Sequence, residues 1–137
     1  MHVLAEGFVL TLFRHGEFLA PSEVEKTIFR MCMQDEARHV GYGTMHLKRF
    51  LQEHPEREPE VHAILDAGEE AMLQLTLEPQ ALEPRLLLAG GGADRMQEGM
   101  LRAGFLYEKQ VREYLHRLKV AGLLRGDRCK MPAQLPH

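Results

Sequence analysis

The chain has 137 residues, of which 45% are hydrophobic and 27% charged, a composition that is typical of one globular domain. Its net charge is -3 and it has no stripe of basic residues, so we do not expect it to bind nucleic acid. The chain has no apolar run of membrane-spanning length, no signal peptide and only Cys32 and Cys129, in no metal-ligand spacing; we therefore expect a cytoplasmic protein with no membrane partner.

The periodicity of apolar residues predicts an all-α protein without strands. The expected helices cover about residues 3–14, 22–53, 59–77 and 93–122. Residues 1–124 are expected to form one helical domain. The tail, 125–137, has two prolines and little to bury, and is expected to be irregular.

The first predicted helix, 3–14, has apolar residues nearly all round it, which indicates burial on most sides. Glu6 lies on it among Val3, Val9 and Phe13, where a carboxylate is out of place. Met1 lies just before this helix, with no polar capping residue and no preceding turn, as if the helix had been entered part-way. We therefore expect an upstream part to be missing. His15–Gly16 and Ala20–Pro21 are predicted to interrupt the chain after this helix.

The second predicted helix begins at a capping box, in which Ser22 and Glu25 satisfy each other's backbone amides. It is expected to end near Pro55. Spacings of three and four residues predict a buried stripe along it, made of Val24, Ile28, Cys32, Glu36, His39, Gly43, His46 and Phe50.

Proline and glycine divide the second half of the chain. Pro59 suits the first turn of the third helix, while Pro79 and Pro84 are predicted to interrupt the chain after it. The glycines at 90–92 are predicted to break a short apolar segment, and Asp94 is expected to cap the last helix.

Glu36 and His39 are three residues apart on one helix, so both side chains can reach a metal ion lying beside it. The pair Glu113 and His116 has the same spacing, but falls opposite an apolar stripe and is interpreted as a solvated, salt-bridged face. Glu36 and His39 instead lie within an apolar stripe, where an unpaired carboxylate costs several kcal/mol. A metal held by Glu6 and Glu36 together would remove both burial problems, and these ligands suit iron or manganese.

The segments Leu4–Leu10 and Asp35–Gly43 resemble the second half of the ferritin-like di-iron carboxylate superfamily. The closest likeness is to the branch of ribonucleotide reductase small subunits and aminobenzoate N-oxygenases. In that family four core helices supply Glu, Glu-x-x-His, Glu and Glu-x-x-His. The resemblance implies that this chain is the C-terminal half of such a helical bundle. It also implies two iron ions, or iron and manganese, per complete site.

By this resemblance Glu6 matches the lone Glu of the third core helix, and Glu36 with His39 matches the pair of the fourth. Asp35 resembles the family's carboxylate that orients a His ligand on a facing helix. Cys32 stands where N-oxygenase relatives place an extra His, a departure that disfavours oxygenation of arylamines.

His46, Cys32 and Tyr42 are weaker candidates for the site. His46, two turns beyond His39, is expected to be a core histidine more often than a ligand. Tyr42 and Tyr107 are expected to pack as aromatics with satisfied hydroxyls, and redox activity is the less common alternative.

The resemblance implies an O2-activating oxidoreductase or oxygenase, and one chain carries three of six expected ligands. An isolated monomer is therefore expected to be inactive. Either an N-terminal half is missing, or two copies pair as a homodimer and double Glu6, Glu36 and His39 into a full set. Two alternatives remain: a metal-free helical interaction or scaffold module, and a storage-type metal-binding protein. The substrate is an unidentified small molecule.

Overall fold

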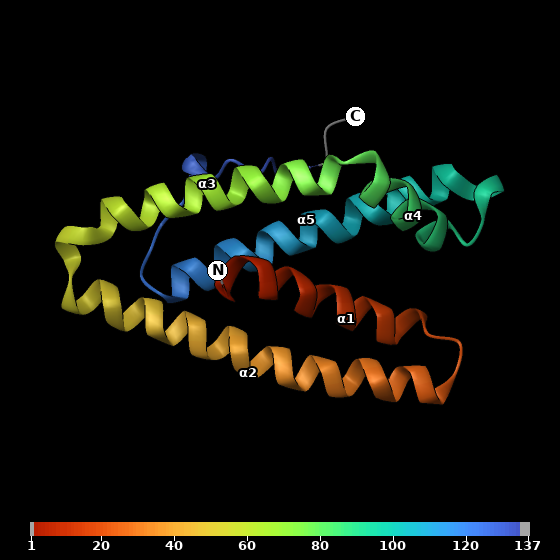
Figure 1. Cartoon of the computed structure of the whole chain (residues 1–137), viewed down its shortest axis with the longest axis horizontal. Coiled ribbons are helices and arrows are strands. Elements are labelled where there is room, and N and C mark those ends of the chain that lie inside the picture. The colour runs from red at the N-terminus through yellow and green to blue at the C-terminus, as the bar shows by residue number, and fades with distance from the viewer. Residues whose placement is uncertain (1, 135–137) are drawn as a thin grey trace.

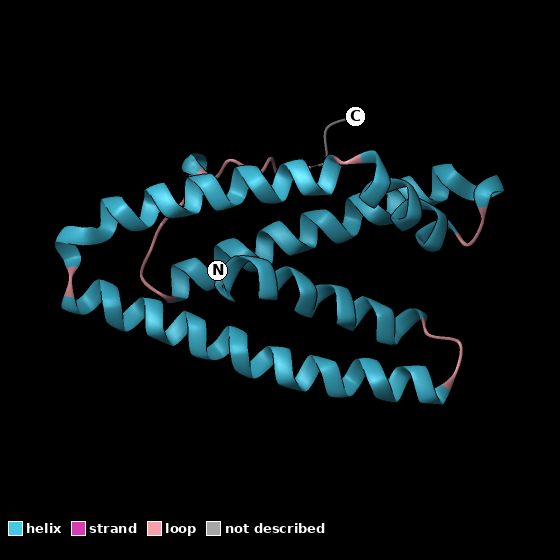
Figure 2. Cartoon of the chain, in the orientation of Figure 1, coloured by secondary structure: helices cyan, strands magenta, loops and turns pink. Residues whose placement is uncertain are grey.

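A computed structural model describes residues 2–134 of the chain, with side chains from residue 3 onward. The described part consists of helices joined by short loops, contains no strand, and forms a helical bundle (Figure 2). Its principal helices are α1 (Gly7–Leu19), α2 (Glu23–Glu53), α3 (Glu58–Leu77), α4 (Pro79–Gly90) and α5 (Met96–Val120). Short turns are η1 (His2–Glu6), which is π-helical, and the 3-10 turns η2 (Pro55–Arg57), η3 (Ala93–Arg95) and η4 (Gly126–Arg128). The all-α prediction is confirmed.

The bundle is elongated, with α2 and α3 as long outer helices joined at one end (Figure 1). Helices α1 and α5 lie between them, and α4 packs against the N-terminal part of α5 at the opposite end. None of the described helices is long and apolar enough to cross a membrane. The α1–α2 hairpin is the part of this architecture that positions the candidate site.

The α1–α2 hairpin follows the predicted signals at one break and departs from them at another. At Ser22 the capping box is present: the Glu25 amide donates to Ser22 Oγ (3.2 Å), and the Ser22 amide donates to Glu25 Oε2 (3.1 Å). The predicted break at His15–Gly16 is wrong, because α1 continues through it to Leu19. A Cβ on Gly16 would lie 2.6 Å from the Phe29 ring, so glycine serves close helix packing there.

Two predictions for the second half of the chain also differ from the structure. The expected short apolar segment after Pro79 is the helix α4, which tolerates Pro84 in its interior. Asp94 does not cap α5, because it lies within the turn η3 and α5 begins after Arg95. Gly122, with φ of 90°, ends α5 as expected, and the Leu123 amide donates to the Leu118 carbonyl (2.9 Å).

The hydrophobic core lies where η1, α1, α3, α5 and the C-terminal segment meet. Its buried members are Val3, Leu4, Phe8, Leu65, Tyr107, Val111, Tyr114, Leu118, Leu123 and Met131. The expectation that residues after 124 have little to bury is wrong, since Arg125 and Met131 are both buried. The segment is irregular apart from η4, but it is packed against the bundle.

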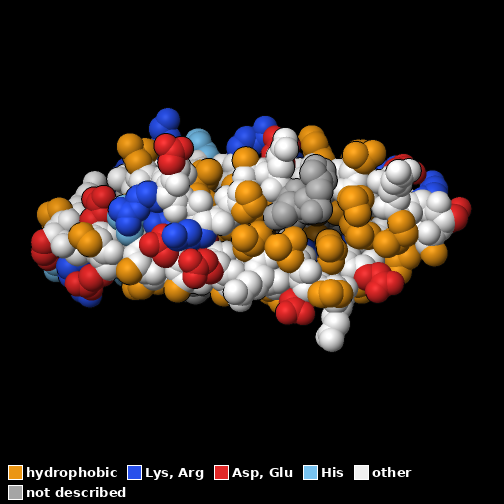
Figure 3. Space-filling view, turned by 90° about the horizontal axis from the view of Figure 1, so that it is seen from above, with side chains coloured by type: hydrophobic (Ala, Val, Ile, Leu, Met, Phe, Trp, Pro, Cys, Tyr) orange, Lys and Arg blue, Asp and Glu red, His pale blue; other side chains and the backbone are white. Residues whose placement is uncertain are grey.

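Charged and hydrophobic side chains are distributed unevenly over the face that carries α3 and the C-terminal segment. Figure 3 shows charged side chains gathered toward the end where α2 and α3 join, and hydrophobic side chains gathered toward the α4 end. The helices α3 and α4 expose Ile64, Leu75 and Leu88. Exposed apolar side chains are therefore not confined to the helices that carry the candidate ligands.

Candidate metal centre

The structure brings together the three residues that the sequence proposes as metal ligands. Glu6 is the last residue of η1, while Glu36 and His39 lie one turn apart on α2. One potential ligand atom from each lies within 4.8 Å of the other two. The antiparallel packing of the N-terminal segment on α2 makes this possible, since Glu6 and Glu36 are far apart in the sequence. The Glu36 and His39 pair on α2 and the Glu6 carboxylate thus belong to one group of possible ligands.

This group lies at the boundary between protein interior and solvent. The Glu36 side chain is 21% exposed and its Oε2 atom is buried, whereas the His39 side chain is 63% exposed. His39 Nδ1 lies 3.6 Å from Glu36 Oε2, which is too long for a hydrogen bond. Glu36 Oε2 accepts no hydrogen bond from the described residues. A buried carboxylate oxygen in this state is costly, and a cation beside it would offset that cost.

The backbone at Glu6 is unusual in a way that sequence periodicity does not reveal. Residues His2–Glu6 form a π-helical turn, which then continues as the regular helix α1. Such turns widen a helix locally, change the direction of the side chains that follow, and occur frequently at functional sites. The turn places Glu6 opposite Glu36 while Leu4 and Phe8 on either side are buried in the core.

The other candidates around the motif lie at the surface. Asp35 is exposed and forms an ion pair with Arg38 on the same helix, so among the described residues it orients no histidine. Cys32 is a free, partly buried thiol. The expectation of a core His46 and a packed Tyr42 is wrong: both are exposed, and their rings stack with centroids 6.0 Å apart. Neither is placed by any contact that would make it part of the ligand group.

The reason for these differences is that the predicted buried stripe of α2 is largely open. Val24 and Ile28 are more than half exposed, whereas Val40 and Thr44, on the other side of the helix, are buried. Helix α1 packs on that other side, beside Phe29 and Phe13. Glu36 lies at the margin of the contact with the N-terminal segment, and His39 lies beyond it.

The pair Glu113 and His116, predicted to be a solvated, salt-bridged face, is salt-bridged to Arg14 and Arg117, but it is only partly solvated. His116 is exposed, but the Glu113 side chain is only 26% exposed and accepts a hydrogen bond from the buried Thr11 hydroxyl (2.7 Å). Arg14 also donates to Glu113 (3.1 Å). This carboxylate therefore joins α5 to α1 and has a hydrogen-bond donor for each of its oxygens, whereas Glu36 Oε2 accepts no hydrogen bond from the described residues.

A buried ionic cluster between α3 and the C-terminal segment was not foreseen from the sequence. The side chains of Glu69 and Arg125 are both fully buried, with Arg125 Nη2 2.6 Å from Glu69 Oε2. The Tyr114 hydroxyl donates to Glu69 Oε1 (2.6 Å), and the Lys130 amide donates to Glu69 Oε2 (2.8 Å). Burial first, and the hydrogen bond to Glu69 second, raise the pKa of Tyr114. Because every Glu69 oxygen is occupied, this cluster ties the C-terminal segment down and leaves no ligand atom for a metal.

Two carboxylates and one imidazole around a common point can hold a divalent iron or manganese ion by their oxygen and nitrogen atoms. The absence of thiolates from the group disfavours structural zinc. Comparisons of the chain with known protein families, curated proteins and solved structures find no match.

Proposed function

We propose that this chain supplies half of a di-iron, or iron and manganese, carboxylate site in a ferritin-like protein that activates O2 as an oxidoreductase or oxygenase. The observation that carries the proposal is the convergence of Glu6, Glu36 and His39 within 4.8 Å. The set is one Glu plus one Glu-x-x-His, which is the half-site implied by the sequence resemblance. Its donor atoms suit iron and manganese.

Each ligand has a distinct part in such a site. Glu6 and Glu36 would each hold a metal ion through a carboxylate oxygen, and His39 through an imidazole nitrogen. Bound iron or manganese would supply the electron-transfer chemistry with O2. The burial of Glu36 Oε2 excludes water from the inner edge of the site, while the exposure of His39 leaves the outer edge open. The remaining ligands must approach from that open edge.

The open edge continues into a row of exposed apolar side chains along α2. The row consists of Val24, Ile28, Met31, Tyr42 and Met45, with the Asp35–Arg38 ion pair at its middle. These positions recur at intervals of three and four residues, so they share one face of the helix. An apolar face of this length on one helix is typical of a surface that another helix covers.

A second copy of the chain fits this row in an antiparallel arrangement. Pairing about a two-fold axis near its middle would set Asp35 against the partner subunit's Arg38 and apolar residues against apolar residues. It would also bring a second Glu and Glu-x-x-His toward the open edge of the site. The other candidate occupant is an upstream segment that carries the same ligand types.

The test is the metal content of the chain, by mass spectrometry, and its mass by light scattering after expression with iron or manganese. We expect metal to bind and Glu36→Gln to lose most of it, because this substitution removes the buried charge at constant size. Glu53→Gln is the matched control: it is the same change on the same helix, at an exposed carboxylate paired with Arg49. Consumption of O2 by the reduced, loaded protein separates an oxidoreductase from a storage protein.

The possible outcomes separate the proposals. About one metal per chain in a dimer would support the symmetric site. Metal-free protein that aggregates would support the upstream segment as the missing half. A metal-free monomer that stays in solution would overturn the metal proposal in favour of a helical interaction module. Full metal loading of Glu36→Gln would overturn the ligand assignment.

A further inference from the structure

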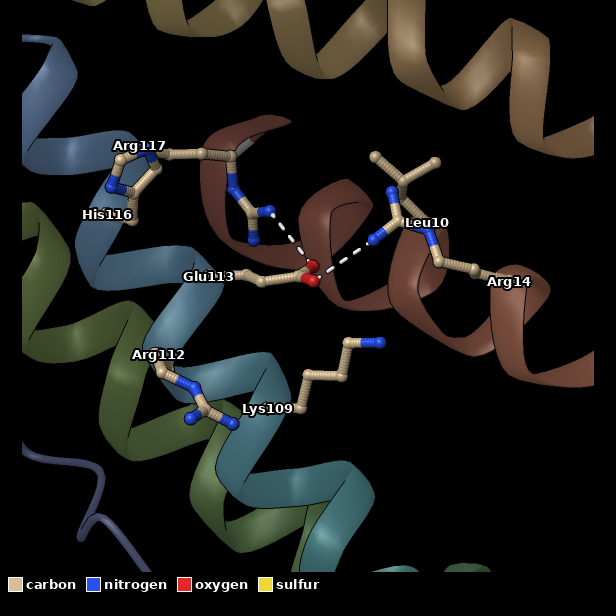
Figure 4. Close-up of a pocket in the computed structure, with 7 residues that line it drawn as sticks. All are labelled: Leu10, Arg14, Lys109, Arg112, Glu113, His116 and Arg117. Carbon is tan, nitrogen blue, oxygen red and sulfur yellow. Dashed lines mark hydrogen bonds and ion pairs between the residues drawn. The ribbon is translucent and has the colours of Figure 1, made fainter.

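A hollow of about 530 Å³ lies between α1 and α5. It is lined by Leu10, Arg14, Lys109, Arg112, Glu113, His116 and Arg117 (Figure 4). None of these residues comes from α2, so the hollow is separate from the group formed by Glu6, Glu36 and His39. It is also distinct from the buried cluster around Glu69.

The hollow is strongly cationic for a chain whose net charge is -3. Four cationic side chains line it, and Glu113 is the one carboxylate among them. The Glu113 carboxylate lies between the guanidinium groups of Arg14 and Arg117 (Figure 4). Its Oε1 is 3.1 Å from Arg14 Nη1, and its Oε2 is 3.8 Å from Arg117 Nη1. Glu113 holds the two arginines in position and also accepts a hydrogen bond from Thr11. Because it is one carboxylate among four cations, most of the positive charge of the hollow is uncompensated.

Several donors around this hollow have no acceptor. Lys109 and Arg112 form no hydrogen bond or ion pair with the described residues. The Nε and Nη2 atoms of Arg117 are buried against Gly7 of α1 and make no hydrogen bond within the described structure, so they add to the cost of its charge without being open to a ligand. Burial lowers the pKa of Arg117, so its charged form is held in a poorly solvated place, and a bound anion would offset this cost.

The backbone of α1 is adapted to this arginine. A Cβ on Gly7 would lie 2.3 Å from Arg117 Nη2 and 2.6 Å from Arg117 Cζ, so a larger residue at position 7 would displace the guanidinium group. Glycine therefore allows Arg117 to lie directly against the first turn of α1. The position of the buried cation is set by the packing of two helices and not by a flexible surface side chain.

We propose that this hollow binds a small molecule carrying a phosphate or diphosphate group. Guanidinium groups present paired donors that match the oxygens of a phosphate, and a lysine adds a point charge. A charge of about -2 to -3 on the ligand balances what Glu113 leaves uncompensated. The cations line a recess and not a stripe along the molecule, which favours a small ligand over a nucleic acid backbone. Binding at this place needs no metal at the other site.

The test uses inorganic pyrophosphate as the probe in titration calorimetry of the full chain. We expect saturable binding that weakens about tenfold in Arg112→Gln and in Lys109→Gln, since each loses a charge-assisted contact. Arg112 is exposed and makes no described contacts, so its substitution leaves the fold intact. Arg49→Gln, an exposed cation on α2, is the matched control and should bind as the unaltered chain does.

Three results would overturn the proposal. The first is the absence of saturable pyrophosphate binding at millimolar concentration, and the second is binding that Arg112→Gln and Lys109→Gln leave unchanged. The third is sedimentation of the chain with vesicles of anionic phospholipid that free pyrophosphate does not prevent, which would assign the hollow to a lipid surface. Sedimentation that pyrophosphate abolishes, or no sedimentation at all, agrees with a small ligand.

Discussion

The buried ionic cluster predicts a large loss of stability on Arg125→Met. Arg125 donates to Glu69 through Nε (3.0 Å) and Nη2 (2.6 Å), and to Asp66 through Nη2 (2.6 Å). Removing it leaves the fully buried Glu69 carboxylate without this counter-charge, although the Tyr114 hydroxyl and the Lys130 amide still donate to it. Loss of one partner of a buried pair costs about 3–5 kcal/mol. Since whole domains are stable by about 5–15 kcal/mol, this is a large fraction.

Urea unfolding followed by circular dichroism, at one protein concentration, measures this loss. Arg49→Met is the control, because Arg49 and Glu53 form an exposed ion pair whose loss should cost below about 1 kcal/mol. The double variant Glu69→Leu with Arg125→Met should cost less than the sum of the two single variants, since no buried charge is then left alone. The reasoning would be refuted if Arg125→Met cost no more than Arg49→Met, or if the two single costs were additive.

Three further predictions concern packing, alkaline pH and capping. A Cβ on Gly99 would lie 2.1 Å from the Leu86 carbonyl oxygen, so Gly99→Ala should destabilise the fold by about 1–3 kcal/mol. A Cβ on Gly104 would have no atom within 4 Å, so Gly104→Ala should stabilise the helix by up to about 1 kcal/mol. Thermal unfolding measures both effects. Burial raises the pKa of Tyr107 from 10.0 to about 12, so the unfolded chain ionises first and stability should fall between pH 10 and 12. Tyr107→Phe should reduce that fall. Because the pKa of Tyr114 is raised as well, the alkaline absorbance titrations of the two proteins are compared, and loss of no delayed phenol in Tyr107→Phe would contradict the prediction. Ser22→Ala should cost about 1 kcal/mol by urea unfolding.

Local sequence signals predicted where most helices lie, because those signals act over a few residues. The capping box at Ser22, the stop before Pro55 and the left-handed Gly122 each depend on neighbouring backbone alone. The signals failed where packing overrode them. Gly16 stays helical against the Phe29 ring, and Pro84 is held inside α4, so neither residue interrupts its helix.

The candidate ligands could be selected from the sequence because each is a charged or polar residue among apolar neighbours. The Glu69–Arg125 pair offers no such signal, since Glu69 is followed directly by Glu70 and its partner is 56 residues away. Only the return of the C-terminal segment across α3 joins them. Buried ion pairs that link distant segments depend on tertiary packing, and a periodic pattern carries no information about them.

The face of α2 that sequence periodicity marked as buried is open in this chain, and this difference bears directly on the metal site. Periodicity reports that a face is apolar, not which segment covers it. Ile28 lies on this face, eight residues or about 12 Å along the helix from Glu36. An Ile28→Asp substitution touches no ligand, yet it should lower both dimer mass and metal content if a second copy completes the site. Leu88→Asp, at an exposed leucine on α4, should change neither. Equal effects of the two substitutions would mean that the row on α2 has no special part in closing the site.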